Sequence, residues 1–169
     1  MSNLRINLAS GQRPFGENWI NCDRQQRWSP DVLCDMTSMP MFADGSADMI
    51  VIHHGAEHLH LEELDACLKE CHRILAPGGS LLLFLPDIRA LCHAWIEQKI
   101  SDYIFCVNMW GAYQGDPNDD HHWGWHMQSM GEKLVATAPW KAIYPFDWRE
   151  IPGSDLARDW WLFSIEAVK

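Results

Sequence analysis

The sequence lacks the features of a membrane-spanning or disulfide-bonded secreted chain. Its longest apolar run, Leu81–Leu85, is far shorter than the ~20 residues that cross a bilayer. None of the six cysteines forms a Cys-x-x-Cys pair, and most lie in apolar runs, where a free thiol behaves as a small hydrophobic group. Residues 1–10 show no positively charged start followed by a long apolar run, so no signal peptide is expected. We therefore expect a reduced, cytoplasmic protein that does not associate with membranes.

Basic residues are also scarce. The chain has 13 Lys and Arg against 23 Asp and Glu, giving a formal net charge of −10, and no dense basic cluster is visible. Because an acidic surface repels phosphate backbones, we expect no nucleic-acid partner. The 169 residues fit a single domain spanning 1–169, which is long enough to bury a core without disulfide support. Tryptophan, in contrast, is abundant, with ten residues.

Short apolar runs alternate with polar or helical stretches through the first half of the chain. The pattern predicts strands at Leu4–Leu8, Trp19–Cys22, Val32–Cys34, Asp48–His53 and Leu81–Leu85. The last two runs are continuously apolar, which is typical of strands covered on both faces, as in a parallel sheet.

The clearest helix pattern lies between those two strands, at Leu61–Leu75. Apolar residues recur there at spacings of three and four and share one face, namely Leu61, Leu64, Leu68, Cys71 and Leu75. Acidic residues in the first turn and basic residues near the end suit the helix dipole. Pro77-Gly78-Gly79 is expected to stop the helix and turn the chain into the next strand. The unit is βαβ, which implies a right-handed parallel crossover.

The second half predicts two more helices, a polar loop and two strands. The helices are expected at Ile88–Ile100 and Met127–Ala138, the loop at Gly111–Trp125, and the strands at Ala142–Pro145 and Trp160–Val168. We expect the last strand to pair antiparallel. No internal repeat is visible, and the alternation predicts an α/β fold.

The first and third strands are each followed by residues that can contact a ligand. The turn Ala9-Ser10-Gly11 follows the first strand, and its small residues let a ligand approach N–H groups that can hold a carboxylate. Asp35-Met36 follows the third strand, and an acid beside an apolar side chain suits an adenine. A capping Asp with a core Met is the alternative for this pair.

Asp23 ends the second strand. A carboxylate at that edge can accept two hydrogen bonds from a ribose diol, although a turn or capping role is an equal alternative. Because the ends of parallel strands converge on one crevice, the three strand ends taken in order predict a ligand site there.

The combined order of these motifs resembles a known family. INLASG, NWINCD, DVLCDMTSMPMFADGSADMIVIHHGAEHL and LKECHRILAPGGSLLLFLPD are similar to the short S-adenosylmethionine (SAM)-dependent methyltransferases of class I. The resemblance covers about Leu4–Asp87, with a weaker echo from Trp110 to His126. It implies a seven-stranded, mostly parallel Rossmann-like sheet that binds SAM over the strand ends.

The resemblance also implies roles for individual residues. Ala9, Ser10 and Gly11 would face the methionine part of SAM, and Asp23 would hold the ribose. Asp35 and Met36 would flank the adenine, while His53 and His54 would lie near the sulfonium.

Two features depart from the family pattern. The usual Gly-x-Gly turn reads Ala9-Ser10-Gly11, and only about ten residues separate the first two strands, whereas a full crossover with its helix needs ~10–12 or more. The first crossover is therefore expected to be truncated. One wall of the pocket would then be thin or open, and a second subunit could complete it in a homo-oligomer.

The nine histidines raise the question of a metal. His54, Glu57 and His58 spell H-x-x-E-H, a pattern that one class of zinc peptidases also uses. Here the pattern follows a strand and lies in a methyltransferase-like context, and a catalytic zinc site needs three protein ligands. We therefore expect no metal, and we expect His58 to be packed or hydrogen-bonded beside the helix start. A metal-dependent hydrolase is the third-ranked hypothesis.

The loop around His121 is a further site candidate. It is polar, and Asn118, His121 and Gly124 loosely match a late segment of the resembling family. His121 or His54 is expected to accept a proton, since imidazole titrates near neutral pH. An acidic surface loop with aromatic anchors is the alternative.

The function expected from these observations is methyl transfer from SAM to an oxygen, nitrogen or sulfur atom of a small-molecule or sugar-like acceptor. The runner-up is a methyltransferase-like binding or regulatory module without catalysis, which the altered glycine turn and the short crossover favour.

Overall fold

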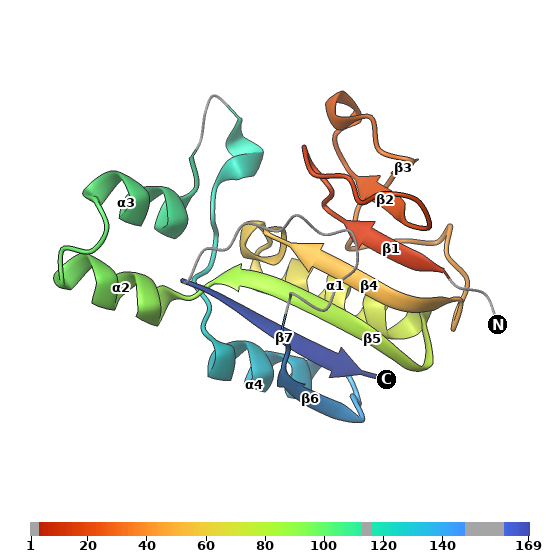
Figure 1. Cartoon of the computed structure of the whole chain (residues 1–169). Helices are drawn as coiled ribbons and strands as arrows, with labels where there is room; N and C mark the ends of the chain where they lie inside the picture. The colour runs from red at the N-terminus through yellow and green to blue at the C-terminus, as the bar shows by residue number, and fades with distance from the viewer. Residues whose placement is uncertain (1–3, 113–115, 148–160) are drawn as a thin grey trace.

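A seven-stranded sheet forms the centre of the computed structural model, which describes residues 4–112, 116–147 and 161–169 (Figure 1). The strands are β1 (Arg5–Leu8), β2 (Ile20–Asp23), β3 (Val32–Leu33), β4 (Ala47–His53), β5 (Leu75–Pro86), β6 (Ala142–Pro145) and β7 (Leu162–Val168). They lie in the order β3-β2-β1-β4-β5-β7-β6. The first five strands pair in parallel, while β7 is antiparallel to both β5 and β6. This confirms the predicted Rossmann-like sheet with an antiparallel C-terminal strand.

Four α-helices and three 3₁₀ turns complete the described chain. The helices are α1 (Leu61–Ile74), α2 (Ile88–Ile96), α3 (Asp102–Trp110) and α4 (Met127–Thr137), and the 3₁₀ turns are η1 (Gln26–Trp28), η2 (Ala56–His58) and η3 (Pro117–Asp119). Leu64 and Leu68 of α1 share one core cluster with Met130 and Leu134 of α4, so these two helices cover the same face of the sheet. A second, smaller cluster of buried apolar side chains consists of Phe15, Trp19, Val51, Leu82 and Phe84.

The helix between β4 and β5 forms as its apolar spacing predicts. It ends at Ile74, and β5 begins at once at Leu75, so Pro77-Gly78-Gly79 lies within the bounds of the strand, at an irregularity where the pairing with β4 shifts from Ala47–Leu75 to Met49–Ser80. Gly79 is required at its position, because a Cβ there would lie 3.0–3.1 Å from three carbonyl oxygens. The predicted strand Leu81–Leu85 is the buried middle of this longer strand.

The connection between β1 and β2 contains no helix in residues 9–19, all of which the structure describes. This confirms the predicted truncated crossover. Phe15 and Trp19 from this connection pack edge to face, with ring centroids 4.8 Å apart, and both side chains are buried. Two aromatic side chains thus cover sheet surface that a crossover helix would otherwise cover.

The helix predicted at Ile88–Ile100 is wrong at its end. It stops at Ile96, Gln98 has a φ of +58°, and the chain reverses into α3, which the sequence analysis did not predict. Trp95 causes part of this reversal, since its Nε1 donates to Asp102 (2.7 Å) and its ring stacks on Phe105 at 4.7 Å. Both helices project beyond the carboxyl ends of the strands (Figure 1).

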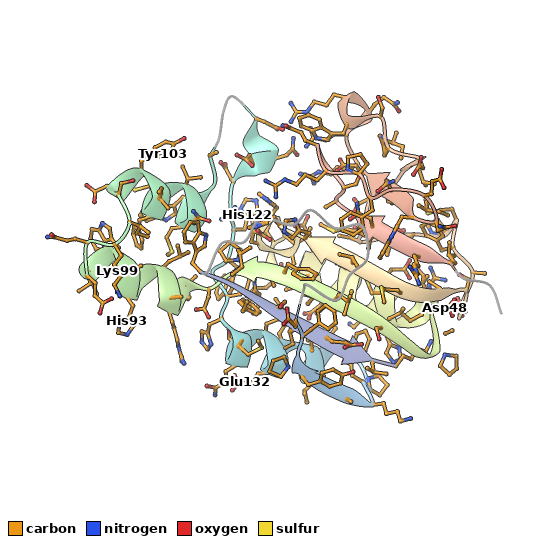
Figure 2. All side chains as sticks on the ribbon, viewed as in Figure 1. Asp48, His93, Lys99, Tyr103, His122 and Glu132 are labelled. Carbon is orange, nitrogen blue, oxygen red and sulfur yellow. The ribbon has the colours of Figure 1, made fainter. Side chains whose placement is uncertain are left out.

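Helix α3 stands apart from the core. All nine of its residues are described, and none is buried. Tyr103 on this helix is 72% exposed and points away from the sheet (Figure 2). The helix is therefore held by its ends and by α2.

The C-terminal elements follow their predicted ranges closely. Helix α4 ends one residue earlier than predicted and β6 has the predicted bounds. The predicted start of the last strand, Trp160, lies outside the described residues. All six cysteines are free thiols, and no helix in the described ranges is long and apolar enough to cross a membrane.

Candidate functional site

A cavity of about 620 Å³ lies at the carboxyl ends of the parallel strands. One wall comes from the turns that follow β1, β2 and β3, another from the end of β4 and from η2, and a third from α3 and the segment around η3. All nine site residues named from the sequence line this cavity, namely Ala9, Ser10, Gly11, Asp23, Asp35, Met36, His53, His54 and His121. The structure thus brings the whole set together, and the role of each residue stays a prediction.

The turn after β1 keeps a left-handed shape despite its altered sequence. Ala9 has a φ of +53° and Gly11 a φ of +49°, so an alanine occupies a conformation that glycine adopts without strain. The N–H of Ser10 donates to Cys22 O (3.0 Å), and the N–H of Gly11 donates to Asp23 Oδ2 (2.9 Å). These two N–H groups are therefore engaged by the protein, contrary to the expectation that they would face a carboxylate.

Arg13 supplies a positive group near that turn. Its backbone N–H donates to Ser10 O at 2.9 Å, and the residue is exposed and lines the cavity. Arg13 could not be identified from the sequence, because a single arginine in a loop belongs to no recognisable pattern.

Asp23 has the turn role that the sequence offered as an alternative, and it also lines the cavity. Its Oδ1 accepts from Gln25 N at 2.8 Å and its Oδ2 accepts from Gly11 N, so it does fix the turn. The side chain is buried but lines the cavity. A carboxylate has about four lone-pair positions, so further hydrogen bonds from a ligand remain open to it.

Asp35 likewise shows the turn role. Its Oδ1 accepts from both the N–H and the hydroxyl of Thr37, at 2.8 and 2.7 Å. Met36 beside it is half-buried and packs against the core while also lining the cavity. The pair therefore presents one acidic and one apolar group to the same space.

His53 lies at the end of β4, under the cavity. The side chain is buried, and its Nε2 has no hydrogen-bond partner in the described part of the chain. Burial lowers the pKa of this imidazole to about 3, helped by the nearby His54 and Arg13. His53 is therefore neutral at physiological pH.

His54 forms a dyad with Glu57. The His54 Nδ1–H donates to Glu57 Oε1 at 3.0 Å, and His54 has a φ of +52°. Glu57 is only 2% exposed. Burial opposes its ionisation, but the hydrogen bond from His54 and the neighbouring imidazoles of His58 and His121 outweigh burial and lower the carboxyl pKa to about 2. The sequence offered Glu57 only as part of the H-x-x-E-H motif, which does not reveal its buried position beside His54.

The third wall of the cavity is tied to the first by two polar bridges. Arg24 donates to the Asn118 side chain, and Arg27 forms an ion pair with Asp116. Since Arg24 and Arg27 follow β2 while their partners belong to the segment around η3, these contacts join the two sides of the cavity.

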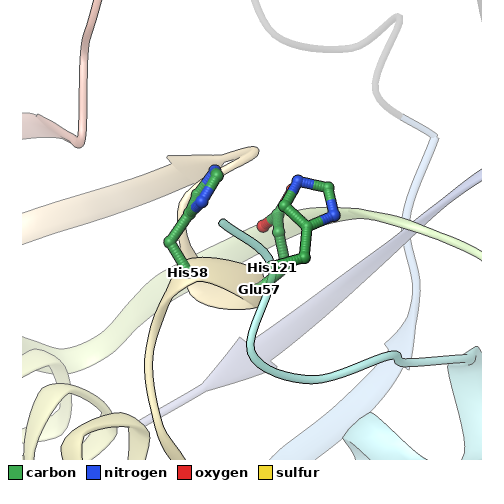
Figure 3. Close-up of side chains that lie close together, drawn as sticks. All are labelled: Glu57, His58 and His121. Carbon is green, nitrogen blue, oxygen red and sulfur yellow. The ribbon is translucent and has the colours of Figure 1, made fainter. Parts of the chain in front are cut away.

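His121 and His58 meet where that segment approaches η2. The His121 Nδ1–H donates to Asn108 O at 3.0 Å, and the His58 Nδ1–H donates to Asp120 O at 3.2 Å. Burial lowers the pKa of His121. Both side chains and that of Glu57 point toward one another (Figure 3). His58 is hydrogen-bonded beside the helix start, in line with its predicted setting.

Comparisons with known proteins agree with this architecture. The profile of a family described as "Methyltransferase domain" matches residues 15–83. The chain is similar to this family over the matched part, which is less than half of its length. The matched residues run from the first crossover to the middle of β5 and include the predicted cofactor residues Asp23, Asp35, Met36 and His53.

Similarity to solved structures extends over almost the whole chain. A SAM-dependent methyltransferase from Archaeoglobus fulgidus matches with a TM-score of 0.63 and 14% identity, over 99% of this chain and 86% of that one. A protein from Pyrococcus horikoshii matches with a TM-score of 0.64 and 14% identity, over 99% and 82%.

A third solved structure contains ligands. The 1,6-didemethyltoxoflavin-N1-methyltransferase of Burkholderia thailandensis, with 1,6-didemethyltoxoflavin and S-adenosylhomocysteine bound, has a TM-score of 0.56 and 14% identity, over 99% of this chain and 71% of that one. At such identities the likeness shows the fold, and the predicted class I methyltransferase fold is confirmed. No curated protein sequence matches the chain.

Proposed function

We propose that this chain transfers a methyl group from SAM to a small polar acceptor. The observation that carries the proposal is the single cavity that gathers the ends of four parallel strands and all nine residues named from the sequence. Its volume of about 620 Å³ falls within the ~300–1,000 Å³ of pockets that hold a drug-sized ligand. The methyltransferase relatives, one of them with S-adenosylhomocysteine bound, support SAM as the donor.

The residues present fit the parts of SAM in order along the sheet. Asp23 would accept hydrogen bonds from the ribose diol, and Asp35 with Met36 would flank the adenine. Ala9, Ser10 and Gly11 would pass close to the methionine part, and Arg13 would pair with its carboxylate. When bound, the sulfonium supplies the reactive methyl carbon, and the chain aligns it with the acceptor.

His53 suits a place beside a sulfonium. Because its imidazole is neutral, it does not repel a cation, and its buried Nε2 has no hydrogen-bond partner among the described residues. A protonated histidine at the same position would instead weaken donor binding through like-charge repulsion.

His54 is the residue best placed to take a proton from the acceptor. Glu57 holds its Nδ1–H, which leaves the lone pair of the neutral ring on Nε2. His121 shares this feature, since the Asn108 carbonyl holds its Nδ1–H. Of the two, His54 is joined to a buried carboxylate, which stabilises an imidazolium more than a carbonyl does.

The cavity wall favours a small acceptor with hydroxyl or amine groups. Asn108, Asp119 and His121 line the side opposite the strand turns and offer both hydrogen-bond donors and acceptors. A small-molecule or sugar-like acceptor fits this wall better than a nucleic acid does, given the net charge of −10.

Calorimetric titration with SAM and S-adenosylhomocysteine tests the donor site. Asp23→Asn, which keeps the side-chain shape and one of the two turn hydrogen bonds but removes the charge, should weaken binding at least 10-fold. Asp48→Asn at the opposite end of β4 is the matched control and should bind like the wild type (Figure 2). Unchanged affinity in Asp23→Asn would remove Asp23 from the site.

Measuring turnover distinguishes a methyltransferase from the alternative of a binding module without catalysis. The protein is incubated with SAM and a panel of small hydroxyl- and amine-bearing compounds, and S-adenosylhomocysteine is measured. His54→Asn should lower its formation by 10²-fold or more, the range typical of general-base loss, while SAM affinity stays within about 3-fold. Asparagine is chosen because it tolerates a positive φ. SAM binding without product formation in the wild type would favour the regulatory module.

A further inference from the structure

Glu57, His58 and His121 bring three potential metal ligands to one point. One ligand atom from each lies within 4.8 Å of the other two (Figure 3). Ligand atoms around a zinc ion at ~2.0–2.2 Å lie roughly 3–4 Å apart, so movements on the order of 1 Å bring this set to bonding distance. Two residues come from η2 and one from the segment after η3, which the fold brings together across more than sixty positions of sequence.

The carboxylate of Glu57 has one oxygen without a partner. Its Oε1 accepts from His54, whereas Oε2 is buried and accepts no hydrogen bond from any described residue. Leaving a buried carboxylate oxygen unpaired costs free energy, which a cation at that oxygen would recover. The side chain is 2% exposed, so bulk water does not satisfy it.

Both histidines are held in the tautomer that binds metals. His58 donates its Nδ1–H to the Asp120 carbonyl and His121 donates its Nδ1–H to the Asn108 carbonyl. A carbonyl only accepts, so Nδ1 carries the proton and the Nε2 lone pair is free for an ion. Histidine ligands typically show this arrangement, in which the second ring nitrogen donates to a carbonyl or carboxylate.

The backbone fixes the two segments against each other. His122 N donates to Glu57 O at 2.9 Å, and His121 N donates to Trp110 O at 3.1 Å. The ligand set is therefore preorganised by hydrogen bonds that do not use the ligand atoms.

We propose that Glu57 Oε2, His58 Nε2 and His121 Nε2 bind one divalent transition-metal ion, with Zn²⁺ the best match. Two imidazoles and one carboxylate suit zinc and its neighbours and disfavour Mg²⁺ and Ca²⁺, which prefer all-oxygen sets. Since His58 and His121 line the cavity, an open coordination position would face the space beside the methyl donor.

This site differs from the one that the H-x-x-E-H motif suggests. In the zinc peptidases both histidines of the motif are ligands. Here His54 is not one of the three ligands and instead donates a hydrogen bond to the Glu57 carboxylate. The third ligand, His121, comes from outside the motif, from the segment after η3.

Zinc binding by the full chain tests the proposal without any methyl transfer. The protein is stripped with a chelator, titrated with Zn²⁺ by calorimetry, and its retained metal is counted by mass spectrometry. One ion per chain is expected, with Mg²⁺ failing to compete. Glu57→Gln, His58→Ala and His121→Ala should each weaken binding at least 100-fold.

His122→Ala is the matched control. His122 is adjacent to His121 but stacks on His60, with ring centroids 3.9 Å apart, and it is not one of the three ligands. It should bind Zn²⁺ like the wild type. Far-UV circular dichroism verifies folding, and Glu57→Gln, which keeps the side-chain shape, carries the test if a histidine variant unfolds.

Three results would overturn the site. The first is a wild-type protein that retains no ion, the second is wild-type affinity in His121→Ala or Glu57→Gln, and the third is an equal loss in His122→Ala. Because the readout is metal content, it is independent of SAM binding and of the acceptor.

Discussion

Ala9 and Gly55 pack so closely that only one of them has room for a β-carbon. A Cβ built on Gly55 would lie 2.8 Å from the Ala9 Cβ and 3.0 Å from Ile52 Cγ2. Ala9 begins the turn after β1, and Gly55 follows His54 after β4. The methyl group of Ala9 therefore sets the spacing between two turns. The turn after β1 would contact the methionine part of SAM, and the turn after β4 contains His54, the candidate base.

Gly55→Ala should lower stability and weaken SAM binding together. The φ of Gly55 is −135°, which alanine tolerates, so the effect is steric and not a backbone one. Overpacking of this kind costs ~1–3 kcal/mol, measured by urea unfolding, and calorimetry should show a several-fold loss of SAM affinity.

The double variant Ala9→Gly/Gly55→Ala is the control for that contact. It removes the closest clash and the left-handed alanine at once, so it should recover more than half of the lost stability. If the double variant is as unstable as Gly55→Ala, the Ile52 contact and not Ala9 is responsible.

His53 should make the protein lose stability in mild acid. Its folded pKa is about 3 and its unfolded value is 6.5, so the unfolded state binds more protons between those values. The free energy of unfolding therefore falls as pH drops from about 6.5 toward 3. His53→Gln removes this contribution, so between pH 7 and pH 4 the variant should lose less stability than the wild type. Urea unfolding at stepped pH measures both slopes, and equal slopes would contradict the burial effect.

The bridges across the cavity should control how fast the cofactor leaves. Arg24→Gln/Arg27→Gln should raise the dissociation rate of S-adenosylhomocysteine several-fold, because the two polar contacts between the β2 side and the segment around η3 are then lost. The Arg27 guanidinium lies over the Trp28 ring at 4.5 Å, so stopped-flow tryptophan fluorescence can follow the release.

The same double variant should leave unfolding within about 0.5 kcal/mol of the wild type, since the Arg27 side chain is 52% exposed and exposed ion pairs contribute little. Arg89→Gln, an exposed site outside the cavity lining, is the control for net charge. Equal dissociation rates in the wild type, the double variant and Arg89→Gln would show that the bridges do not retain the cofactor.

Arg73 should stabilise the loop that leads into β4. It donates to Met39 O (3.0 Å) and Phe42 O (2.9 Å), and it pairs with Glu70 and Asp44. Arg73→Met keeps the apolar stem but loses these bonds, and we expect a loss of about 2 kcal/mol in urea unfolding. Lys69→Met on an exposed position of the same helix should change stability little. An equal loss in both variants would assign the effect to net charge.

The sequence predicts well which residues line the cavity from the strand ends. The spacing of apolar residues identifies each strand from its local sequence. Asp23, Asp35 and His53 could therefore be placed at the carboxyl ends of their parallel strands. The backbone of Ala9 could not be predicted from its residue type, because alanine is seldom left-handed and the fold imposes that conformation.

The other side of the cavity was not predictable in the same way. Helix α3 buries none of its nine described residues, so its sequence has no amphipathic pattern to reveal it. Glu57 and His121 are more than sixty residues apart in the sequence and come close only in the folded structure. The spacing of residues along the chain therefore does not predict that they are neighbours.

The lack of buried residues in α3 has an evolutionary consequence. The wall that would meet the acceptor is built on a helix that contributes nothing to the hydrophobic core, while the wall that would meet the donor is built on its central strands. Substitutions in α3 can then reshape acceptor choice at little thermodynamic cost, whereas the same number of changes beside the donor would threaten folding. Substitutions in the α2–α3 helical hairpin could thus give this fold new acceptor substrates.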